Sequence, residues 1–369
     1  MNHNAKAPLI HITRRKALPW YRAWLIRVIA VVLGLVLCGI IAMLLVKINP
    51  FEVYRTMLDG AFGTGRRTWV TFQNVAILLG ISLALAPAFK MRFWNLGGDG
   101  QTLMGCLGAT APMILLAGKV PNLLLLFIML VCAVAAGAIW ALIPAAFRAK
   151  WNTNETLFTL MMNYVAVQII SFFVVVWENP KGASKIGIIN PDTMEGWLPE
   201  IGGNQYLINI IIVALLTVIV FVYMRYTKQG YEIAVVGESE PTARYVGIKV
   251  KKVILRTMLI SGMICGLVGF LLVSGTSHTM TTTIVGGRGF TGVMVAWLGK
   301  FNPFFMVLTS LLLVFLDVGG SEISTVFGLN DAFGAILSGI LLFFIIGCEF
   351  FLNYQVRFRK NKKEVKINA

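Results

Sequence analysis

Hydrophobic residues along this 369-residue chain gather in long runs separated by short polar segments. Several runs exceed the roughly 20 residues that a helix needs to cross a bilayer, and the period-two alternation of barrel strands is absent. Only a helix satisfies its backbone groups within a run of this length. The pattern therefore predicts an all-α polytopic membrane protein. The obvious spans cover about residues 23–46, 68–89, 101–117, 123–147, 154–176, 206–226, 253–274, 303–316 and 332–352.

Two polar, glycine-rich runs interrupt this pattern, one in each half of the chain. The first is Gly97-Gly98-Asp99-Gly100 and the second is Gly286-Gly287-Arg288-Gly289. Their offset is 189 residues (286 − 97), about half of the chain. Non-helical breaks at corresponding places in two halves are typical of a transporter built from two repeats.

Composition supports a membrane protein and argues against nucleic acid as a partner. Hydrophobic residues make up 57% of the chain, charged residues only 13%, and the mean hydropathy is +0.79. A soluble domain would carry about twice this charged fraction. The net charge of +16 lies in short loops and tails beside apolar runs, where basic residues set membrane topology.

Both tails, residues 1–24 and 353–369, are basic and are expected in the cytoplasm. The number of crossings must then be even. Nine obvious spans fail this condition, so about residues 282–299 are expected to cross as well, which gives ten. This topology puts Gly97 near the cytoplasmic side and Gly286 near the external side, so the two repeats would be inverted.

The ten spans define a transmembrane domain over residues 25–352, with its longest external loop at 178–204 and a charged cytoplasmic loop at 227–252. Within the charged loop, Ser239 resembles an N-cap, Pro241 suits a first helical turn and Gly247 stops a helix. The loop therefore predicts a short helix outside the membrane.

Several kinds of chemistry have no motif in this chain. No phosphate-binding GxxxxGK[ST] loop is present, so ATP and Mg²⁺ are not expected to bind here, and no nucleophile elbow or HExxH suggests an enzyme. The histidines, which are His3, His11 and His278, are too few for a metal site or proton relay. The cysteines lie in apolar runs without a CxxC pair and are expected as buried thiols, namely Cys38, Cys106, Cys132, Cys265 and Cys348.

A carrier driven by protons or ions usually needs ionisable groups deep in its spans. Glu155, Asp317 and Glu349 are the candidates, and all three lie close to predicted helix ends. A secondary transporter that works without partner subunits therefore remains an alternative function for this chain.

Three motifs appear in order between about residues 70 and 350. Residues 93–101 read FWNLGGDGQ, residues 154–164 read NETLFTLMMNY, and residues 237–248 read GESEPTARYVGI. They resemble the patterns FNIGGEGQ, NEVISTLMLNY and G-x-N-x-x-A-A-R-Y-A-G-I of permease subunits of ABC importers for nucleosides and simple sugars, a family of branched-chain amino acid and ribose type. Within it the chain looks like the longer nucleoside-system permease. It departs from the pattern at Trp94, at Asp99 and over 238–241.

The resemblance implies the non-catalytic subunit of a bacterial importer in the cytoplasmic (inner) membrane. Expected partners are an ABC ATPase subunit that binds ATP and Mg²⁺, a second, shorter permease in a heterodimer, and an extracytoplasmic substrate-binding protein or lipoprotein. The charged loop would hold the coupling helix that seats on the ATPase. The coupling residues are Gly237, Glu238, Ser239, Glu240, Arg244, Tyr245 and Gly247.

Uncharged polar residues in or beside the spans are candidates for a substrate path. Asn95, Gln101 and Asn163 suit a neutral substrate with many hydroxyl groups, or else they bond to neighbouring helices and cap broken ends. Thr281 and Thr282, with Arg288, would line the outer mouth. Nucleosides are the expected substrates, and simple sugars or riboflavin are the alternatives.

Overall fold

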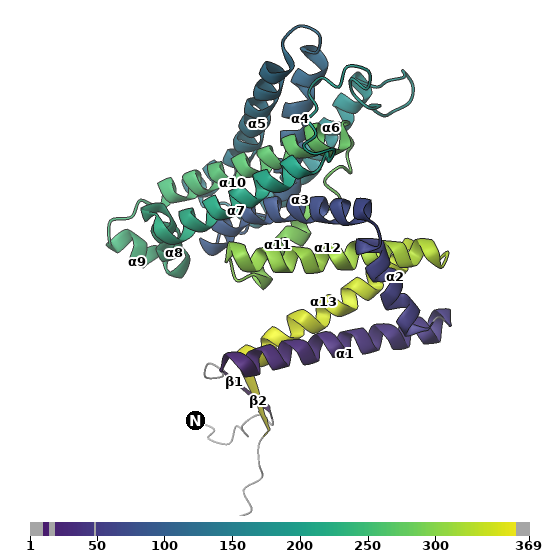
Figure 1. Cartoon of the computed structure of the whole chain (residues 1–369). Coiled ribbons are helices and arrows are strands. Elements are labelled where there is room, and N and C mark those ends of the chain that lie inside the picture. The colour runs from purple at the N-terminus through teal and green to yellow at the C-terminus, as the bar shows by residue number, and fades with distance from the viewer. Residues whose placement is uncertain (1–9, 15–18, 48, 359–369) are drawn as a thin grey trace, which may run out of the picture. The chain divides into compact units, whose positions relative to one another are not determined.

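Most of the described residues lie in helices in the computed structural model, which describes residues 10–14, 19–47 and 49–358 (Figure 1). Thirteen α-helices, one short π-helix and two short strands lie within these ranges. The chain divides into two units, one comprising Met1–Gly60 with Leu316–Ala369 and the other comprising Ala61–Phe315. The all-helical prediction is confirmed apart from the strand pair.

The larger unit is built around three buried helices, α3 (Gly65–Lys90), α4 (Gly98–Leu115) and α10 (Val250–Leu272). α10 packs on α3, α4 and α5, while α11 and α7 pack on α3, and α6 packs on α4. A π-helix, η1 (Val273–Ser277), extends α10. The surrounding helices are α5 (Asn122–Trp151), α6 (Glu155–Val176), α7 (Leu207–Tyr226), α8 (Lys228–Glu238), α9 (Glu240–Tyr245) and α11 (Arg288–Leu298).

Small residues bring α4, α5 and α10 into backbone contact. A Cβ placed on Gly137 of α5 would lie 2.4 Å from the carbonyl oxygen of Gly262 in α10, and one on Gly105 of α4 would lie 2.7 Å from the Cα of Gly266. Such close approach is typical of membrane helices, whose association depends on packing rather than on hydrophobic burial. Any side chain at these positions would force the helices apart.

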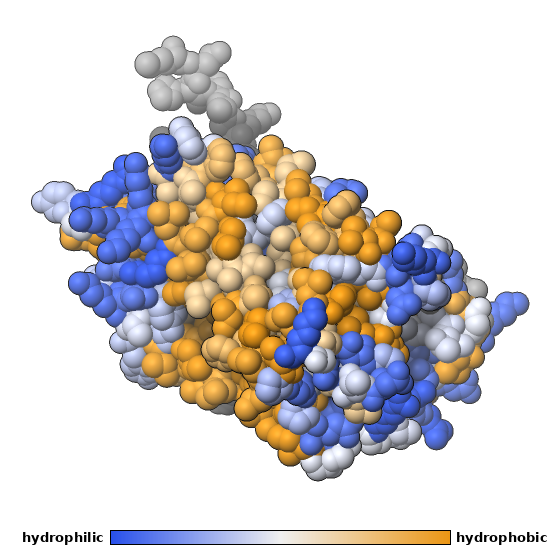
Figure 2. Space-filling model, turned by 90° about the horizontal axis from the view of Figure 1, so that it is seen from above, coloured by the Kyte–Doolittle hydropathy of each residue, from blue (hydrophilic) through white to orange (hydrophobic). Residues whose placement is uncertain are grey.

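Seven helices in the described part of the chain are long and apolar enough to cross a membrane, and they include α12 (Pro303–Val326) and α13 (Asp331–Asn353). The others are α3, α5, α6, α7 and α10 with η1. α1 (Trp20–Val46) contains a shorter apolar stretch, while α4 and α11 are shorter helices. Large hydrophobic side chains of α5, α6 and α7 are exposed, and Figure 2 shows hydrophobic side chains over much of one face. The protein is therefore a polytopic membrane protein.

In the smaller unit, α1 packs along α13 and α2 (Pro50–Phe62) follows α1. Strand β1 (Ile10–Arg14) pairs antiparallel with β2 (Tyr354–Phe358), with Ile10 opposite Phe358. The sequence prediction did not include this pair. β-Branched residues alternate with polar ones in Ile10-His11-Ile12-Thr13, a pattern that favours strands once a partner lies alongside.

Candidate functional site

The first glycine-rich break, between α3 and α4, is held from the side by α6. The Asn163 amide nitrogen donates to the Leu96 carbonyl oxygen at 2.8 Å, and the Gly100 N–H donates to Asn163 Oδ1 at 2.9 Å. One side chain therefore bridges both sides of the break. The Leu96 N–H donates to Thr159 Oγ1 at 3.1 Å, one turn earlier on α6.

A second amide, Asn95, holds the break from within. Its Oδ1 accepts from the Gly97 N–H at 3.0 Å and from Gln101 Nε2 at 3.1 Å, while its Nδ2 donates to Ser261 Oγ of α10 at 3.3 Å. Asn95, Gln101 and Asn163 are all buried. Three predicted path residues thus meet at one place, bonded to the break and to neighbouring helices, as the alternative interpretation expected. Gln101 Oε1 has no hydrogen-bond partner among the residues that the structure describes.

The two glycine-rich breaks contact each other, whereas the topology expected from the sequence put Gly97 and Gly286 near opposite sides of the membrane. The Gly289 N–H, in the first turn of α11, donates to Asp99 Oδ1 in the first turn of α4 at 2.8 Å. A Cβ on Gly289 would lie 2.6 Å from the Asp99 backbone nitrogen, so only glycine allows this approach. An acidic side chain facing a helix N-terminus is favoured by the helix dipole. Arg288 donates to Asn74 Oδ1 of α3 at 2.9 Å.

Thr281 and Thr282 lie in the irregular segment between η1 and α11 and are partly exposed. Within the described chain, no hydrogen bond joins either one to the group formed by Asn95, Gln101 and Asn163. The structure therefore places the predicted path residues in two separate groups.

The charged loop forms two helices where one was predicted. Thr227 is the N-cap of α8, since its Oγ1 accepts from the Gly230 N–H at 3.1 Å, and Ser239 separates α8 from α9. Ser239 Oγ accepts from the Thr242 N–H at 3.3 Å, and Gly247 ends the segment with φ +83°. The predicted N-cap and stop residue of α9 are confirmed.

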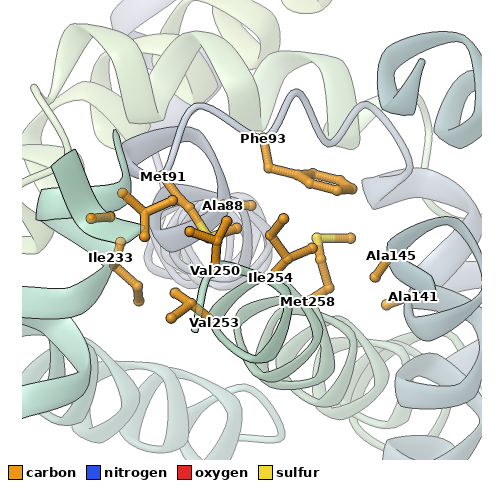
Figure 3. Packing of buried hydrophobic residues seen from close by; sticks show 12 residues of the cluster. Ala88, Met91, Phe93, Ala141, Ala145, Ile233, Val250, Val253, Ile254 and Met258 are labelled. Carbon is orange, nitrogen blue, oxygen red and sulfur yellow. The ribbon is translucent and has the colours of Figure 1, made fainter. Parts of the chain in front are cut away.

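A buried hydrophobic cluster attaches this charged segment to the helix bundle (Figure 3). Ile233 of α8 and Ala243 of α9 pack in it with Met91, Phe93 and the first turns of α10. Gly237 belongs to the same contact, because a Cβ there would lie 2.1 Å from the carbonyl oxygen of Lys90. Gly237 is therefore buried against the end of α3.

The opposite side of α9 is exposed. Tyr245 is 93% exposed, the Arg244 side chain is 68% exposed, and Glu238 and Gly247 are exposed as well. A tyrosine and an arginine held on a short, fixed helix are the residue types that most often anchor a protein partner.

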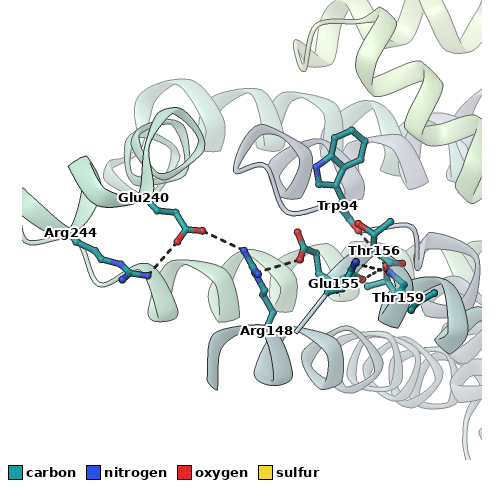
Figure 4. Close-up of polar contacts among 9 residues, drawn as sticks. Trp94, Arg148, Glu155, Thr156, Thr159, Glu240 and Arg244 are labelled. Carbon is teal, nitrogen blue, oxygen red and sulfur yellow. Dashed lines mark hydrogen bonds and ion pairs between the residues drawn. The ribbon is translucent and has the colours of Figure 1, made fainter. Parts of the chain in front are cut away.

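A line of ion pairs runs from this exposed helix to the start of α6 (Figure 4). Arg244 contacts Glu240 at 3.4 Å, Glu240 contacts Arg148 at 3.7 Å, and Arg148 at the end of α5 contacts Glu155 at 3.5 Å. The Glu155 carbonyl oxygen accepts from Thr159 Oγ1, the side chain that also accepts from Leu96 of the break. The exposed helix and the break are thus joined by consecutive polar contacts.

The three carboxylates considered for ion coupling have different surroundings. Glu155 is paired with Arg148 in the first turn of α6. Asp317 is exposed on α12. The Glu349 side chain lies outside the described residues.

On the other side of the larger unit, the segment 178–204 attaches to the end of η1. The Trp197 ring stacks on His278 with centroids 3.7 Å apart, and the Leu198 N–H donates to the Ser274 carbonyl oxygen at 2.9 Å. His278 caps the end of η1. Burial lowers the pKa of the His278 imidazole below its ordinary value. Hydrogen bonds from the Gly182 and Ser184 N–H groups lower the pKa of Glu178.

Sequence reasoning missed the linking roles of Asp99 and Arg148. Asp99 occupies the acidic position of the first motif, which was a usable signal. Arg148 belongs to none of the three motifs, and its two acidic partners are 7 and 92 residues away in the chain (155 − 148 and 240 − 148). Nothing local in the sequence connects them.

Known proteins resemble this chain over nearly its whole length. It is 29% identical over 347 residues to the guanosine ABC transporter permease protein NupP of Bacillus subtilis, covering 93% of this chain and 97% of that protein. It is 28% identical over 363 residues to the glucose ABC transporter permease protein TsgB13 of Haloferax volcanii, covering 94% and 93%. It is 27% identical over 333 residues to the nucleoside ABC transporter permease protein NupB of Lactococcus lactis, covering 88% and 91%.

The family comparison agrees with these relatives and with the three motifs. Residues 67–346 match the model described as branched-chain amino acid transport system / permease component. This match covers most of the chain, including both glycine-rich breaks, α9 and all the helices between them. The chain belongs to this family of ABC importer permeases, whose members are the non-catalytic, membrane-embedded subunits.

Proposed function

We propose that this permease carries nucleosides into a bacterial cell by alternating access, driven by a separate ATPase subunit that binds α9. The line of ion pairs from Arg244 to Glu155 is the observation that carries the proposal. It gives the exposed helix a direct connection to the break, so a displacement of α9 acts on the contact between the two halves. Glu238, Ser239, Tyr245 and their neighbours would face the ATPase. Gly237 would instead let α8 pack closely against the end of α3.

During alternating access, the two parts that move relative to each other would be two inverted repeats in a ten-span topology. The offset of the two breaks carries Gly98, the first residue of α4, to Gly287, the N-cap of α11. α3 packs on α11 while α10 packs on α4, so each half contributes a helix to the other. The pairing of β1 with β2 supports an even number of crossings, because it places both tails on one side. That side would be the cytoplasm, given its basic residues.

Nucleosides are the proposed substrates because two of the three relatives above carry guanosine or nucleoside in their names. A glucose permease among those relatives makes simple sugars the second candidate. Either kind of substrate is neutral and rich in hydroxyl groups. Asn95, Gln101 and Asn163 would meet such groups only if the break opens during transport, with Thr281 and Thr282 nearer the outer mouth.

The assembly would contain further subunits. We propose a second, shorter permease as a heterodimer partner, two ATPase sites, and a substrate-binding protein or lipoprotein on the external side. Segment 178–204 is the surface of this chain proposed to meet that binding protein. No cofactor is proposed for this subunit itself.

Uptake of labelled guanosine, uridine, glucose and riboflavin, in cells with and without the gene, tests the proposal. Each measurement is repeated with ATP depleted and with the ion gradients collapsed. Nucleoside uptake that requires the gene and ATP but survives gradient collapse is the expected result. Uptake that follows the gradient would refute the importer mechanism and make Glu155 and Asp317 the groups to test.

The link through Arg148 has its own test in the purified complex. Arg148→Gln and Glu240→Gln are each expected to lower transport per ATP hydrolysed by about tenfold, a usual size for coupling between sites. The double variant should lose little more than either single variant, because both remove the same link. Arg55→Gln is the control, since Arg55 pairs with Asp59 on the exposed surface of α2. Fully additive losses would contradict a shared link.

A further inference from the structure

A basic pocket opens where three candidate membrane spans end. Its volume is about 400 Å³, and it lies between the last residue of α3, the end of α7, helix α8, and the loop 300–302 with the first residue of α12. α3, α7 and α12 are all long and apolar enough to cross a membrane. In a membrane the pocket would therefore lie at the level of the lipid headgroups.

Among the described residues, three cations line this pocket and no carboxylate does. They are Lys90, Arg225 and Lys300, and the remaining lining residues include the aromatic rings of Tyr231 and Phe301. Arg225 stands over the Phe221 ring at 5.9 Å, which holds its guanidinium near the pocket. An arginine and two lysines around one concavity suit a phosphate group, which accepts hydrogen bonds from several donors at once.

The loop that carries Lys300 adopts a conformation that is unfavourable for its residues. Lys300 has φ 52° and Phe301 has φ 56°, both in the left-handed region. The Phe301 N–H donates to the Ala296 carbonyl oxygen at 2.9 Å, so Lys300 occupies the helix-ending position that glycine usually takes. A lysine at this position is therefore more strained than a glycine would be.

Apolar surface continues directly from the pocket. Val222 on α7 is 45% exposed, and Phe304 and Phe305 at the start of α12 are 53% and 56% exposed. These side chains would lie against acyl chains, one turn or less from the cations. We propose that this pocket binds the headgroup of an anionic phospholipid, with its acyl chains along α7 and α12. The adjoining apolar side chains favour a lipid over free phosphate.

The occupied pocket would also fix α8, since Tyr231 and Ala234 of that helix line it. α8 leads through Ser239 into α9, so the lipid would steady the segment that bears the exposed helix. The site is independent of which substrate the permease carries.

The test uses the purified full chain in detergent micelles, titrated with phosphatidylglycerol, phosphatidylcholine or inorganic phosphate. Bound lipid is counted by native mass spectrometry, and thermal unfolding is followed in parallel. Phosphatidylglycerol is expected to bind more tightly than phosphatidylcholine. Arg225→Gln with Lys300→Gly should weaken it by roughly 25-fold, about fivefold for each cation near an anionic lipid.

Two controls keep the test decisive. Lys251→Gln with Lys252→Gln removes two exposed cations from the first turn of α10 and should leave binding unchanged. Lys300→Gly alone should unfold in phosphatidylcholine at the same or a higher temperature, because glycine adopts positive φ without strain. The proposal would be overturned if both lipids bound equally, or if the Lys251→Gln and Lys252→Gln control lost as much phosphatidylglycerol binding as the pocket variant. It would also be overturned if Lys300→Gly were less stable than the unchanged protein. Equal protection by phosphate would overturn the lipid assignment.

Discussion

Replacing Asn163 by leucine tests whether this side chain holds the first break. The substitution removes the donor to Leu96 and the acceptor for Gly100, whose N–H is buried. An unpaired buried N–H costs about 1–3 kcal/mol, and the lost bond to the carbonyl adds about 0.5–1.5 kcal/mol. Asn163→Leu should therefore lower the free energy of unfolding by about 2–4 kcal/mol.

The assay is unfolding of the purified protein by sodium dodecyl sulfate in mixed micelles. Gln168→Leu is the matched control, because Gln168 is an exposed amide on the same helix, and it should be nearly neutral. Asn163→Asp keeps the acceptor for Gly100 and loses the donor to Leu96, so it should also destabilise the fold.

Hydrogen bonds between membrane helices contribute only about 0.6 kcal/mol on average when measured by double-mutant cycles. A loss below about 1 kcal/mol for Asn163→Leu would therefore refute the reasoning that Leu96 and Gly100 depend on this side chain. If Asn163 instead contacts substrate, Asn163→Leu would raise the KM of uptake while the free energy of unfolding stayed unchanged. The two interpretations are separated by one pair of measurements.

Two further predictions concern the contact between the breaks and the external segment. Gly289→Ala should lower the free energy of unfolding by about 1–3 kcal/mol, since its Cβ would collide with the Asp99 backbone, whereas Gly339→Ala, with open space around it, should be neutral or slightly stabilising. Burial lowers the pKa of His278 in the folded protein, so the fold favours the neutral imidazole. The stability that the neutral imidazole contributes is therefore present above the ordinary histidine pKa of about 6.5 and is lost as the pH falls below that value. Amide hydrogen exchange in 186–198, corrected for the intrinsic pH effect, should accelerate below that pH; His278→Gln should remove this dependence, and an unchanged profile would contradict it.

Features fixed by neighbouring residues were predictable from the sequence. The N-cap at Ser239 and the stop at Gly247 depend on local backbone geometry, and both are found as predicted. Long apolar runs likewise predicted most of the helices. The ends were less predictable, because α8 and η1 form where the sequence indicated only a loop and the end of a span. Their formation depends on packing against α3 and on the attached external segment.

Contacts between distant segments were not predictable in the same way. The spacing of the glycine runs indicated that they are equivalent, but it did not indicate that Asp99 and Gly289 touch. Similarly, the positions of Arg148 and Glu240 gave no sign that they form an ion pair. Such contacts depend on how helices are placed in space, which one sequence without a family alignment does not determine.

The buried amides illustrate why residue type alone left two roles open. An amide within a membrane segment must find hydrogen-bond partners, and either a bent backbone or a polar substrate supplies them. Only the geometry distinguishes these cases: Asn95 and Asn163 are paired with backbone and side-chain groups of the break, whereas Gln101 Oε1 has no partner within the described part of the chain. A substrate that reaches this group would find Asn95 and Asn163 already engaged and Gln101 Oε1 able to accept. Gln101→Leu should therefore affect substrate affinity more than stability, which is the reverse of the expectation for Asn163→Leu.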